Sequence, residues 1–496
     1  MTSSMENNRY ERIRLVGKLI CKSDLHIGTG DLELFEERFE PDKLPDDKEK
    51  IKGGYNSICL DARGQPYLPA STLRGFLRAI ATKHDEDLTR DLFGFADKED
   101  RDKSQSGRVR LYDAFLRTTP ATAPALPYWV RQSSTAIRHG IAIDPITGTV
   151  AAHKLFRHEY VPAGSEFDFE LEADELSESD LAALLGLLAH WDGKATAAIG
   201  KGKTKGQGRL KWELERLEVL GPARYLEWLG SDKPLQDFFC PIASPESAAI
   251  EKPATWELRF RLVPTAPLLV NEPGYVQKKN KQDDPLPDLE YSRRPDGRPI
   301  VPAASLRGLL RGRARRILAT IAAPHDAPDK EAEKKAWEVV ESIVNELFGS
   351  TKRRSPIVID DAVGTSPGEE HRQYFNAVDR FTGGVADGKL YSARAVLCDS
   401  LEGAIYFEPE RMEQYCMPHE DWRRGLLLLV LRDAIEGDLA IGWGKARGYG
   451  AFKVEVEWQG IRIHSWQELK NQCAEEATGW IKDLHDHISS KLRTPQ

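Results

Sequence analysis

The segment GQPYLPASTLRGFLRAIA at residues 64–81 returns as GRPIVPAASLRGLLRGRA at residues 297–314. In both copies a Leu-Pro or Val-Pro pair precedes a Ser or Thr and then apolar residues at helical spacing. Each segment therefore predicts a short extended stretch followed by an amphipathic helix. Ser71 or Thr72 is the expected capping residue of the first helix, and Ser305 precedes the second.

Four further pairs of segments match in the same order along the chain. They are RDLFGF (90–95) with NELFGS (345–350), GRVRLYDAF (107–115) with SPIVIDDAV (355–363), IAIDPITGTVAAHKLF (141–156) with NAVDRFTGGVADGKLY (376–391), and IGKGKTKGQGRLKWE (199–213) with IGWGKARGYGAFKVE (441–455). Ordered matches about 240 residues apart indicate a tandem duplication. The predicted boundaries are a first domain at 1–221, a linker at 222–252 and a second domain at 253–496.

Both copies show the same order of predicted elements. A β-rich stretch (12–27 and 255–270) precedes the helix above, and short strands, a turn-rich hairpin, a second helix (174–191 and 421–435) and a final strand follow it. This order predicts an α+β fold of two tandem ferredoxin-like, RRM-like βαββαβ domains. Residues 328–348 read as a helical insertion of the second copy. A C-terminal helix follows residue 459, with Trp466, Leu469, Trp480 and Ile481 as its expected core face.

Composition fits a globular protein of two domains. The chain has 496 residues, with 40% hydrophobic and 30% charged residues, which is ordinary for a water-soluble protein. It has no apolar run long enough for a transmembrane helix, and its N-terminus has no signal-peptide core, so we expect a cytoplasmic location and no membrane partner. The six cysteines are scattered without a CxxC pair, which argues against a zinc site.

The net charge of −8 argues against nucleic acid only if charge is uniform, and it is not. Residues 30–50 carry nine acids and four bases, whereas residues 293–318 carry eight arginines and one aspartate. A polyanion responds to a local basic surface rather than to the sum of charges. The sequence therefore permits a nucleic-acid site at these basic segments.

The glycine-rich loops give the strongest functional signal. Four glycines with the same spacing and interleaved cations occur in each copy: Gly200, Gly202, Lys203, Lys205, Gly206 and Gly208, then Gly442, Gly444, Lys445, Arg447, Gly448 and Gly450. Glycine lets a backbone approach a ligand closely and expose its amides, and the cations suit phosphate. The structural alternative is a tight helix-to-strand connection. A P-loop is excluded because Ala197 stands where its first glycine is required.

Two other features are weaker candidates for RNA contact. Ser71, Arg74, Ser305 and Arg307 lie near predicted helix N-termini, which favour anions, although simple capping explains the same residues. Turns at Asp144–Gly148 and Asp379–Gly383 lie in predicted protruding hairpins. A hydrophobic or arginine tip on such a hairpin would wedge between bases, and an ordinary turn is the alternative.

Taken in order, these motifs resemble the repeat-associated mysterious protein (RAMP) superfamily of CRISPR-associated proteins. The resemblance rests on LHIGTG at 25–30, PYLPASTLRG, the IDPxTG turn, LFxxEYVPAGSEF and the GxGxxxGxG loops, and it covers most of residues 10–220 and 255–458. It is nearest to the Csm/Cmr-type backbone subunits of type III effectors, and a two-domain chain resembles the fused subunits of III-D variants.

This resemblance implies an antiviral function and a set of partners. It implies binding of a guide crRNA and of complementary target RNA, with target cleavage at regular intervals through a loop aspartate that promotes 2′-OH attack. It implies other RAMP backbone subunits, a large polymerase/cyclase-type subunit and a small subunit as further partners, and it allows Mg²⁺ as a cofactor.

The resemblance also assigns site residues. Its aspartate lies in the loop before the first helix, and counting back 14 residues from Pro302 gives Asp288, with Asp284 and Asp283 as alternatives and Arg293 and Arg294 facing phosphate. The same count from Pro69 gives Tyr55 or Gly54, beside Asn56, which cannot act as a base. The first copy is then inactive, or it uses an upstream acid such as Asp31, Asp42, Asp46 or Asp47.

Two alternatives remain at this point. The chain is a guide-binding scaffold without a catalytic residue, or it is a crRNA-processing endoribonuclease that uses a histidine as general base. His26 is the candidate histidine in the first copy, but the second copy has Leu269 in its place.

Overall fold

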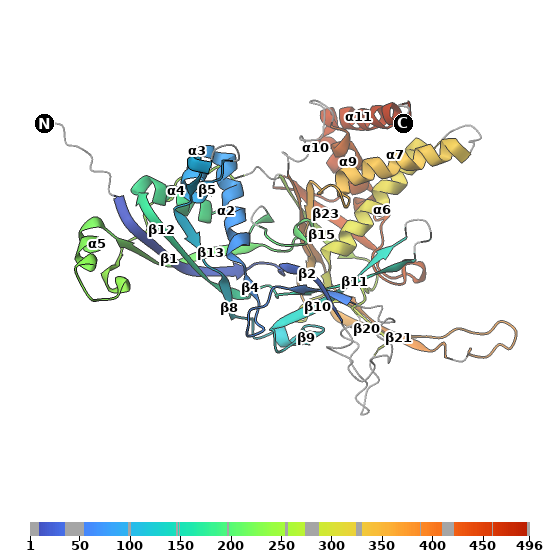
Figure 1. The fold of residues 1–496 in the computed structure, drawn as a ribbon. Helices are drawn as coiled ribbons and strands as arrows, with labels where there is room; N and C mark the ends of the chain where they lie inside the picture. The colour runs from blue at the N-terminus through green and yellow to red at the C-terminus, as the bar shows by residue number, and fades with distance from the viewer. Residues whose placement is uncertain are drawn as a thin grey trace.

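The computed structural model describes residues 9–34, 54–97, 101–144, 147, 149–195, 198–252, 256–272, 287–323, 330–386, 388–408, 421–458 and 460–493. Figure 1 shows two mixed helix-and-sheet domains side by side, the first running from blue to green and the second from yellow to red. Each domain corresponds to one of the two sequence repeats, so the duplication read from the sequence is also a duplication of structure.

The first domain is built on one antiparallel sheet with the strand order β13-β1-β12-β8. The strands are β1 (Arg9–Cys21), β8 (Ala114–Thr118), β12 (Glu166–Ser177) and β13 (Leu210–Leu220), and β7 (Val109–Leu111) also pairs with β12. Alternate residues of β1 from Ile13 to Cys21 are buried, as expected when one face of a sheet is covered. Helices α2 (Ala70–His84) and α4 (Glu178–Leu188) cover that face and share its hydrophobic core.

The second domain repeats this arrangement with the order β23-β15-β22-β19. Its strands are β15 (Trp256–Pro264), β18 (Ile357–Ile359), β19 (Ala362–Gly364), β22 (Leu401–Phe407) and β23 (Phe452–Trp458), and its helices are α6 (Ala303–Ala322) and α9 (Trp422–Ile435). Core residues from both helices and from the sheet, such as Leu306, Leu426 and Leu262, form one buried cluster. The coarse α+β prediction is therefore confirmed for both repeats.

Each domain also carries a smaller sheet that includes a long hairpin. In the first domain this sheet has the order β2-β3-β11-β10-β9, and in the second the order β16-β21-β20. The bounds are β2 (Gly28–Leu34), β3 (Gly54–Ile58), β9 (Trp129–Val130), β10 (Thr135–Ile143), β11 (Val150–Tyr160), β16 (Leu289–Glu290), β20 (Glu369–Phe375) and β21 (Tyr391–Leu397). The short strands are β4 (Tyr67–Leu68), β5 (Gly94–Phe95), β6 (Gln105–Ser106), β14 (Cys240–Pro241), β17 (Ile300–Val301) and β24 (Ile461–Ile463).

The predicted insertion at 328–348 forms helix α7 (Lys330–Phe348), but it is not unique to the second repeat. Helix α3 (Glu86–Phe93) of the first domain ends on the matching phenylalanine and occupies the same place in the element order. The insertion is therefore an N-terminal extension of a helix that both repeats possess.

The segment predicted as a linker is packed onto the first domain. It contains α5 (Pro222–Leu229) and β14, which pairs with β13. Ile250 is buried in the first core, and the Ala248 amide donates to the Ala182 carbonyl at 2.8 Å. These contacts tie residues 222–252 to helix α4 and strand β13.

The C-terminal region forms two helices, α10 (Trp466–Gln472) and α11 (Ala474–Arg493). Leu469 is buried and Trp466 and Trp480 pack against the core as expected, whereas Ile481 is 36% exposed and Leu484 and Ile488 are buried in its place. In the described part of the chain, no helix combines the length and hydropathy needed to cross a bilayer.

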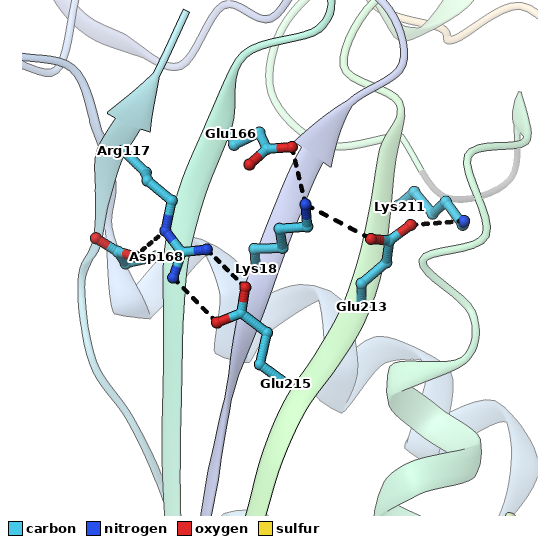
Figure 2. A network of polar contacts seen from close by, with 7 residues as sticks. All are labelled: Lys18, Arg117, Glu166, Asp168, Lys211, Glu213 and Glu215. Carbon is cyan, nitrogen blue, oxygen red and sulfur yellow. Dashed lines mark hydrogen bonds and ion pairs between the residues drawn. The ribbon is translucent and has the colours of Figure 1, made fainter.

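The outer face of the first sheet carries a network of ion pairs, shown in Figure 2. Lys18 lies 2.9 Å from Glu166 and 3.7 Å from Glu213, and Arg117 lies 2.6 Å from both Asp168 and Glu215. Hydrogen bonds from Lys211 and Arg117 lower the pKa values of Glu213 and Glu215. RRM domains stack bases on aromatic side chains of the sheet, whereas this part of the sheet presents paired charges (Figure 2).

Candidate nucleic-acid interface

The two glycine-rich loops have the same backbone geometry. We call residues 199–209 the first glycine loop and residues 441–451 the second glycine loop. Each contains a single 3₁₀ turn, Lys203–Lys205 or Lys445–Arg447, bracketed by four glycines that all have positive φ. A Cβ on Gly208 would overlap the carbonyl oxygen of Ile199, and one on Gly450 would overlap that of Ile441. These glycines are required by the fold of the loop, whatever the loop binds.

Many loop amides donate hydrogen bonds within the protein. The amides of Lys201 and Gly208 donate to the carbonyls of His26 and Asp24 at 2.9 and 2.8 Å, and Trp443 and Gly450 make the equivalent bonds to Leu269 and Pro267. The amides of Lys205, Gly206 and Gln207 close the turn itself. These amides therefore have acceptors within the protein. What the loops present to a polyanion is their cationic side chains.

The first glycine loop lies against the second domain. Arg209 forms an ion pair with Asp360, and the added Cβ at Gly206 would meet the same carboxylate at 2.6 Å. Arg307 donates to the Thr204 carbonyl at 3.3 Å. Lys205 lies 5.3 Å from the Phe156 ring centroid, and burial followed by repulsion from Arg307 lowers the pKa of Lys205. Gly206, Lys205 and Arg307 thus serve the contact between domains, while Lys201 is exposed to solvent.

The helix N-termini are already occupied by carboxylates. Helices α2 and α6 begin after Pro69 and Pro302, neither of which offers a side-chain cap. Asp113 Oδ1 accepts from the Ala70 amide and Asp361 Oδ1 accepts from the Ala303 amide, both at 2.7 Å. The capping role predicted for Ser71, Thr72 and Ser305 is therefore wrong. A phosphate at these helix ends would meet an aspartate in its place.

Arg74 and Arg307 have matching structural roles. Arg74 donates to the Phe93 carbonyl and Arg307 to the Phe348 carbonyl, at the C-terminal ends of α3 and α7. Burial lowers the pKa of Arg307 to about 10. A cation at a helix C-terminus satisfies carbonyls that have no partner within the helix. Both arginines thus make a contact with a helix end inside the protein, and their predicted phosphate contact stays a prediction.

Asp288 lies at the base of the second hairpin. Its Oδ2 accepts from the Ser392 amide at 2.8 Å, and its own amide donates to the Ser392 carbonyl at 3.0 Å. The following strand β16 runs parallel to β21, with Leu289 opposite Ala393. The side chain is exposed, so its carboxylate is fixed on the scaffold and open to solvent. Asp283 and Asp284, the alternatives named above, lie outside the described residues.

An arginine of the second glycine loop contacts the residue that precedes Ser392 on β21, and aromatic rings surround this arginine. Arg447 of the second glycine loop donates to the Tyr391 hydroxyl, and Tyr391 precedes Ser392. The guanidinium lies 5.5, 5.8 and 5.1 Å from the ring centroids of Phe375, Tyr391 and Trp443. Arg447 remains exposed. The second glycine loop and the predicted catalytic aspartate therefore contact neighbouring residues of β21, Tyr391 and Ser392.

The first domain has a different side chain at the position of Asp288. Strand β3 runs parallel to β11 with Asn56 opposite His158, which is the counterpart of Ala393, so Asn56 corresponds to Leu289 and Tyr55 to Asp288. Tyr55 is fully buried and donates to a Glu33 carboxylate oxygen. Asn56 donates to the Arg157 carbonyl at 3.1 Å and accepts from Lys201 at 3.4 Å. No carboxylate takes the place of Asp288 in this described part of the first domain.

Of the upstream acids, only Asp31 lies within the described residues, and Asp42, Asp46 and Asp47 lie outside them. Asp31 is exposed on β2, next to Leu32, which pairs with Asn56. Its amide donates to the Thr29 hydroxyl at 3.0 Å, and that hydroxyl lies 3.1 Å from the Ser57 hydroxyl. Asp31 is therefore one strand away from the position that corresponds to Asp288.

His26 does not have the surroundings of a general base. It is 2% exposed, and its Nδ1 lies 2.6 Å from the Glu159 carbonyl oxygen. Burial lowers its pKa, and its ring meets that of His158 edge-on at 6.0 Å. Burial also lowers the pKa of His158 to about 3. Both rings are thus packed between the hairpin and the glycine loop of the first domain.

Arg293 and Arg294 face the contact between domains. Arg293 forms an ion pair with the buried Glu290, and its guanidinium lies 5.2 Å from the Tyr291 ring centroid. Arg294 lines a cavity of about 220 Å³ between the two domains, together with Arg138, Asp24 and Asp361. Arg293 is therefore partly used inside the protein.

The two hairpins have the turns that the sequence predicts. Asp144 Oδ1 accepts from the Thr147 amide at 2.8 Å, and Asp379 Oδ1 accepts from the Phe381 and Thr382 amides at 2.9 Å. These amide bonds lower the pKa of Asp379. The turn of the second hairpin leaves Phe381 98% exposed, and Figure 1 shows this hairpin extending from the body of the molecule. A hydrophobic tip on a projecting hairpin is thus present in the second domain.

A comparison of the sequence with protein families gives a match in both repeats. The model of the RAMP superfamily matches residues 18–211 and again residues 230–453. The chain belongs to the RAMP superfamily. The resemblance stated from the sequence motifs is therefore confirmed, and the two matched regions follow the two structural domains.

One curated relative matches a stretch about the size of a single repeat. It is the protein named CRISPR system Cms endoribonuclease Csm3 from Methanocaldococcus jannaschii, 24% identical over 234 residues. The alignment covers 44% of this chain and 87% of the relative. The alignment thus spans most of the relative and less than half of this RAMP chain.

Sequence reasoning missed the residues whose partners come from the other domain or from a distant strand. Arg209 was counted only as part of a basic stretch, and Asp360, Ser392 and the aromatic surround of Arg447 were not singled out. The repeat alignment contains one signal that could have found some of these residues, namely a change of residue type at matched loop positions. Lys201 corresponds to Trp443, and Arg209 corresponds to Ala451. Differences between otherwise matched loops mark positions where the two domains do different things.

Proposed function

We propose that this RAMP protein is a backbone subunit of a type III CRISPR effector that binds guide crRNA and cleaves complementary target RNA from its second domain. The strand orders β13-β1-β12-β8 and β23-β15-β22-β19 support two ferredoxin-like domains. The similarity to the Csm3 relative supports the guide RNA and the effector subunits as partners. The guide and target then lie along the side that carries the hairpins and glycine loops.

The observation that carries the proposal is the placement of Asp288. Its carboxylate is exposed, anchored by the Ser392 amide and next to the hairpin base where Arg447 lies. The corresponding residue of the first domain, Tyr55, is buried and carries a phenol in place of a carboxylate. The contrast supports cleavage by the second domain and RNA binding by both.

The reaction is an attack by the 2′-oxygen of one target nucleotide on its own 3′-phosphate. Asp288 orients the 2′-OH and takes its proton as the new P–O bond forms. Arg447 offsets the charge that develops on the phosphorane oxygens. The bond to the 5′-oxygen of the next nucleotide breaks, that oxygen takes a proton from water, and the products carry a 2′,3′-cyclic phosphate and a 5′-OH.

A divalent ion is not built into this scheme. Within the ranges that the structure describes, no three His, Cys, Asp or Glu side chains lie together in a way that would hold a metal ion. Asp288 alone does not make a Mg²⁺ cage, so the described residues do not fit a resident ion. The steps above use only side chains of this protein.

The test is cleavage of end-labelled complementary RNA by the co-expressed, guide-loaded complex. Asp288→Asn keeps an oxygen that can accept from the Ser392 amide but removes the base, so we expect loss of one cut by about 100-fold or more in rate. Asp379→Asn is the matched control, because it changes an exposed aspartate of the same domain that caps the hairpin turn. Guide RNA must co-purify equally with both variants.

Two results would change the assignment. If every cut persists in Asp288→Asn while guide RNA remains bound, the protein is a scaffold and the nuclease lies in a partner. If the quadruple change of Asp31, Asp42, Asp46 and Asp47 to Ala removes a second cut, the first domain is catalytic as well. The crRNA-processing alternative predicts that isolated protein cuts repeat RNA through His26, whose burial argues against it.

A further inference from the structure

The contact between the two domains is centred on one arginine. Arg209, the residue after the last glycine of the first glycine loop, forms an ion pair with Asp360 and lies 4.9 Å from the Tyr406 ring centroid. The side chains of Arg209 and Asp360 are only 11% and 20% exposed. Asp360 follows β18, and Tyr406 lies on the neighbouring strand β22, opposite Val358. An acid and a phenol on adjacent strands thus receive an arginine from the preceding domain.

The first domain contains the same acid and phenol with their positions exchanged. In the repeat alignment Asp360 corresponds to Tyr112. Strand register assigns Tyr406 to Glu172, because Val358 lies opposite Tyr406 and its counterpart Arg110 lies opposite Glu172. The Tyr112 hydroxyl donates to Glu172 Oε2 at 3.1 Å. The geometry that receives Arg209 in the second domain therefore exists in the first domain as well.

In this second copy of the receptor, the arginine that pairs with the carboxylate is Arg110 of the same sheet, and not an arginine from another domain. Arg110 approaches Glu172 Oε2 only at 3.6 Å and pairs with Asp174 at 2.9 Å. The Glu172 side chain is 19% exposed, close to the 20% of Asp360, and Tyr112 is 43% exposed. Arg74 lies where Arg307 lies at the junction, and Arg307 donates there to the Thr204 carbonyl of the incoming loop. The face around Tyr112, Glu172 and Arg74 therefore matches the half of the junction that accepts a glycine loop.

A second copy of this chain does not supply the missing group. In the second glycine loop the counterpart of Arg209 is Ala451, and Arg447 is held among Tyr391, Phe375 and Trp443. A head-to-tail contact joins a glycine loop of one domain to the accepting face of the next domain. A chain of two such domains therefore has an unused accepting face at one end and an unused glycine loop at the other. Copies of the chain form a filament if these two surfaces fit each other. The alanine removes the central charge from the trailing half, which disfavours such a filament.

We propose that the first domain docks a glycine-rich loop of a different protein, through an arginine directly after that loop's last glycine. The arginine pairs with Glu172 and stacks on Tyr112, as Arg209 does with Asp360 and Tyr406. This inference rests on the proposed function, in which the chain is one member of a row of related subunits. To the proposed function it adds the docking face of the first domain and the arginine that this face recognises. It also excludes a second copy of this chain as the docked partner.

The first test restores the missing arginine in this chain. Ala451→Arg should convert the protein from a species of constant mass to one whose mass rises with concentration in sedimentation velocity. Adding Glu172→Gln should return it to constant mass. Ala451→Gln is the matched control, because it adds bulk without charge, and thermal unfolding of each variant confirms that it is folded. An Ala451→Arg chain that stays at constant mass contradicts the proposal, as does wild-type self-association that Glu172→Gln abolishes.

The second test uses the co-expressed complex with its guide. Glu172→Arg repels an incoming arginine, so we expect one neighbouring protein to be lost on purification, while crRNA and the Asp288-dependent cut are retained. If every protein is retained, the docking face is wrong and the proposed function stands. If wild-type complex holds no guide and makes no cut, the proposed function itself fails, and the two failures are thus distinguished.

Discussion

The two domains share a backbone and differ in the chemistry placed on it. Both glycine loops have four glycines at positive φ and the same anchoring bonds to the segment after the first strand. On this common frame the first domain places Lys201 and Tyr55, and the second places Trp443 and Asp288. The comparison shows that the glycines specify shape, whereas the residues between them specify what each domain does.

The largest effect should come from exchanging the residues at the matched strand position. Tyr55→Asp places a charge in a fully buried site and removes the bond to Glu33, so we expect it to lower the free energy of unfolding by about 4 kcal/mol. It should not create a cut. Asp288→Tyr should remove a cut with little change in stability. Chemical denaturation and target cleavage check both variants, and a new cut in Tyr55→Asp would contradict the comparison.

The shared frame can be broken at its glycines. Gly208→Ala and Gly450→Ala force a Cβ into a carbonyl oxygen at positive φ, so each should lower the free energy of unfolding by about 3 kcal/mol. Gly448→Ala meets open space and should cost only about 1 kcal/mol of left-handed backbone strain. Thermal unfolding measures all three variants. Equal losses would show that φ, and not close packing, sets the requirement.

The packed histidines make the first domain sensitive to acid. His158 has a pKa of about 3 when folded and about 6.5 when unfolded. The unfolded chain therefore binds more protons between these values, and stability that is present above pH 6.5 is lost as pH falls. We expect protonation of this residue in the unfolded chain to lower the free energy of unfolding by about 2 kcal/mol between pH 7 and pH 5. His158→Gln should flatten the pH dependence of the melting temperature, and an unchanged slope would contradict the burial argument.

The smallest expected effect is on guide binding, where the two glycine loops differ because Lys201 of the first loop is charged and Trp443 of the second is not. Lys201 is exposed, so Lys201→Ala should weaken guide binding equally for all sequences and reduce the salt slope of binding by about 1. Trp443→Ala should leave the salt slope unchanged, because it removes no charge. Filter binding of crRNA at several salt concentrations measures both. A matched fall in slope for Trp443→Ala would mean that the aromatic residues hold Arg447 in its binding position.

The duplication, the α+β order of elements and the family followed from the sequence alone. They rest on local patterns: ordered repeats, helical or alternating spacing of apolar residues, and glycines where the backbone turns left-handed. The count that selected Asp288 over Tyr55 was also local, because the matched strands keep their register with the neighbouring hairpin.

Tertiary structure alone decided which charged residues are used inside the protein. Local patterns predict an anion site at Ser71, Arg74, Ser305 and Arg307, but Asp113 and Asp361, which lie between strands distant in the sequence, cap the helices. The arginines meet carbonyls at the ends of other helices, and Arg209 meets a carboxylate of the other domain. A carboxylate many residues away removes an anion site without any local trace in the sequence, because the pairing depends on how strands and domains come together.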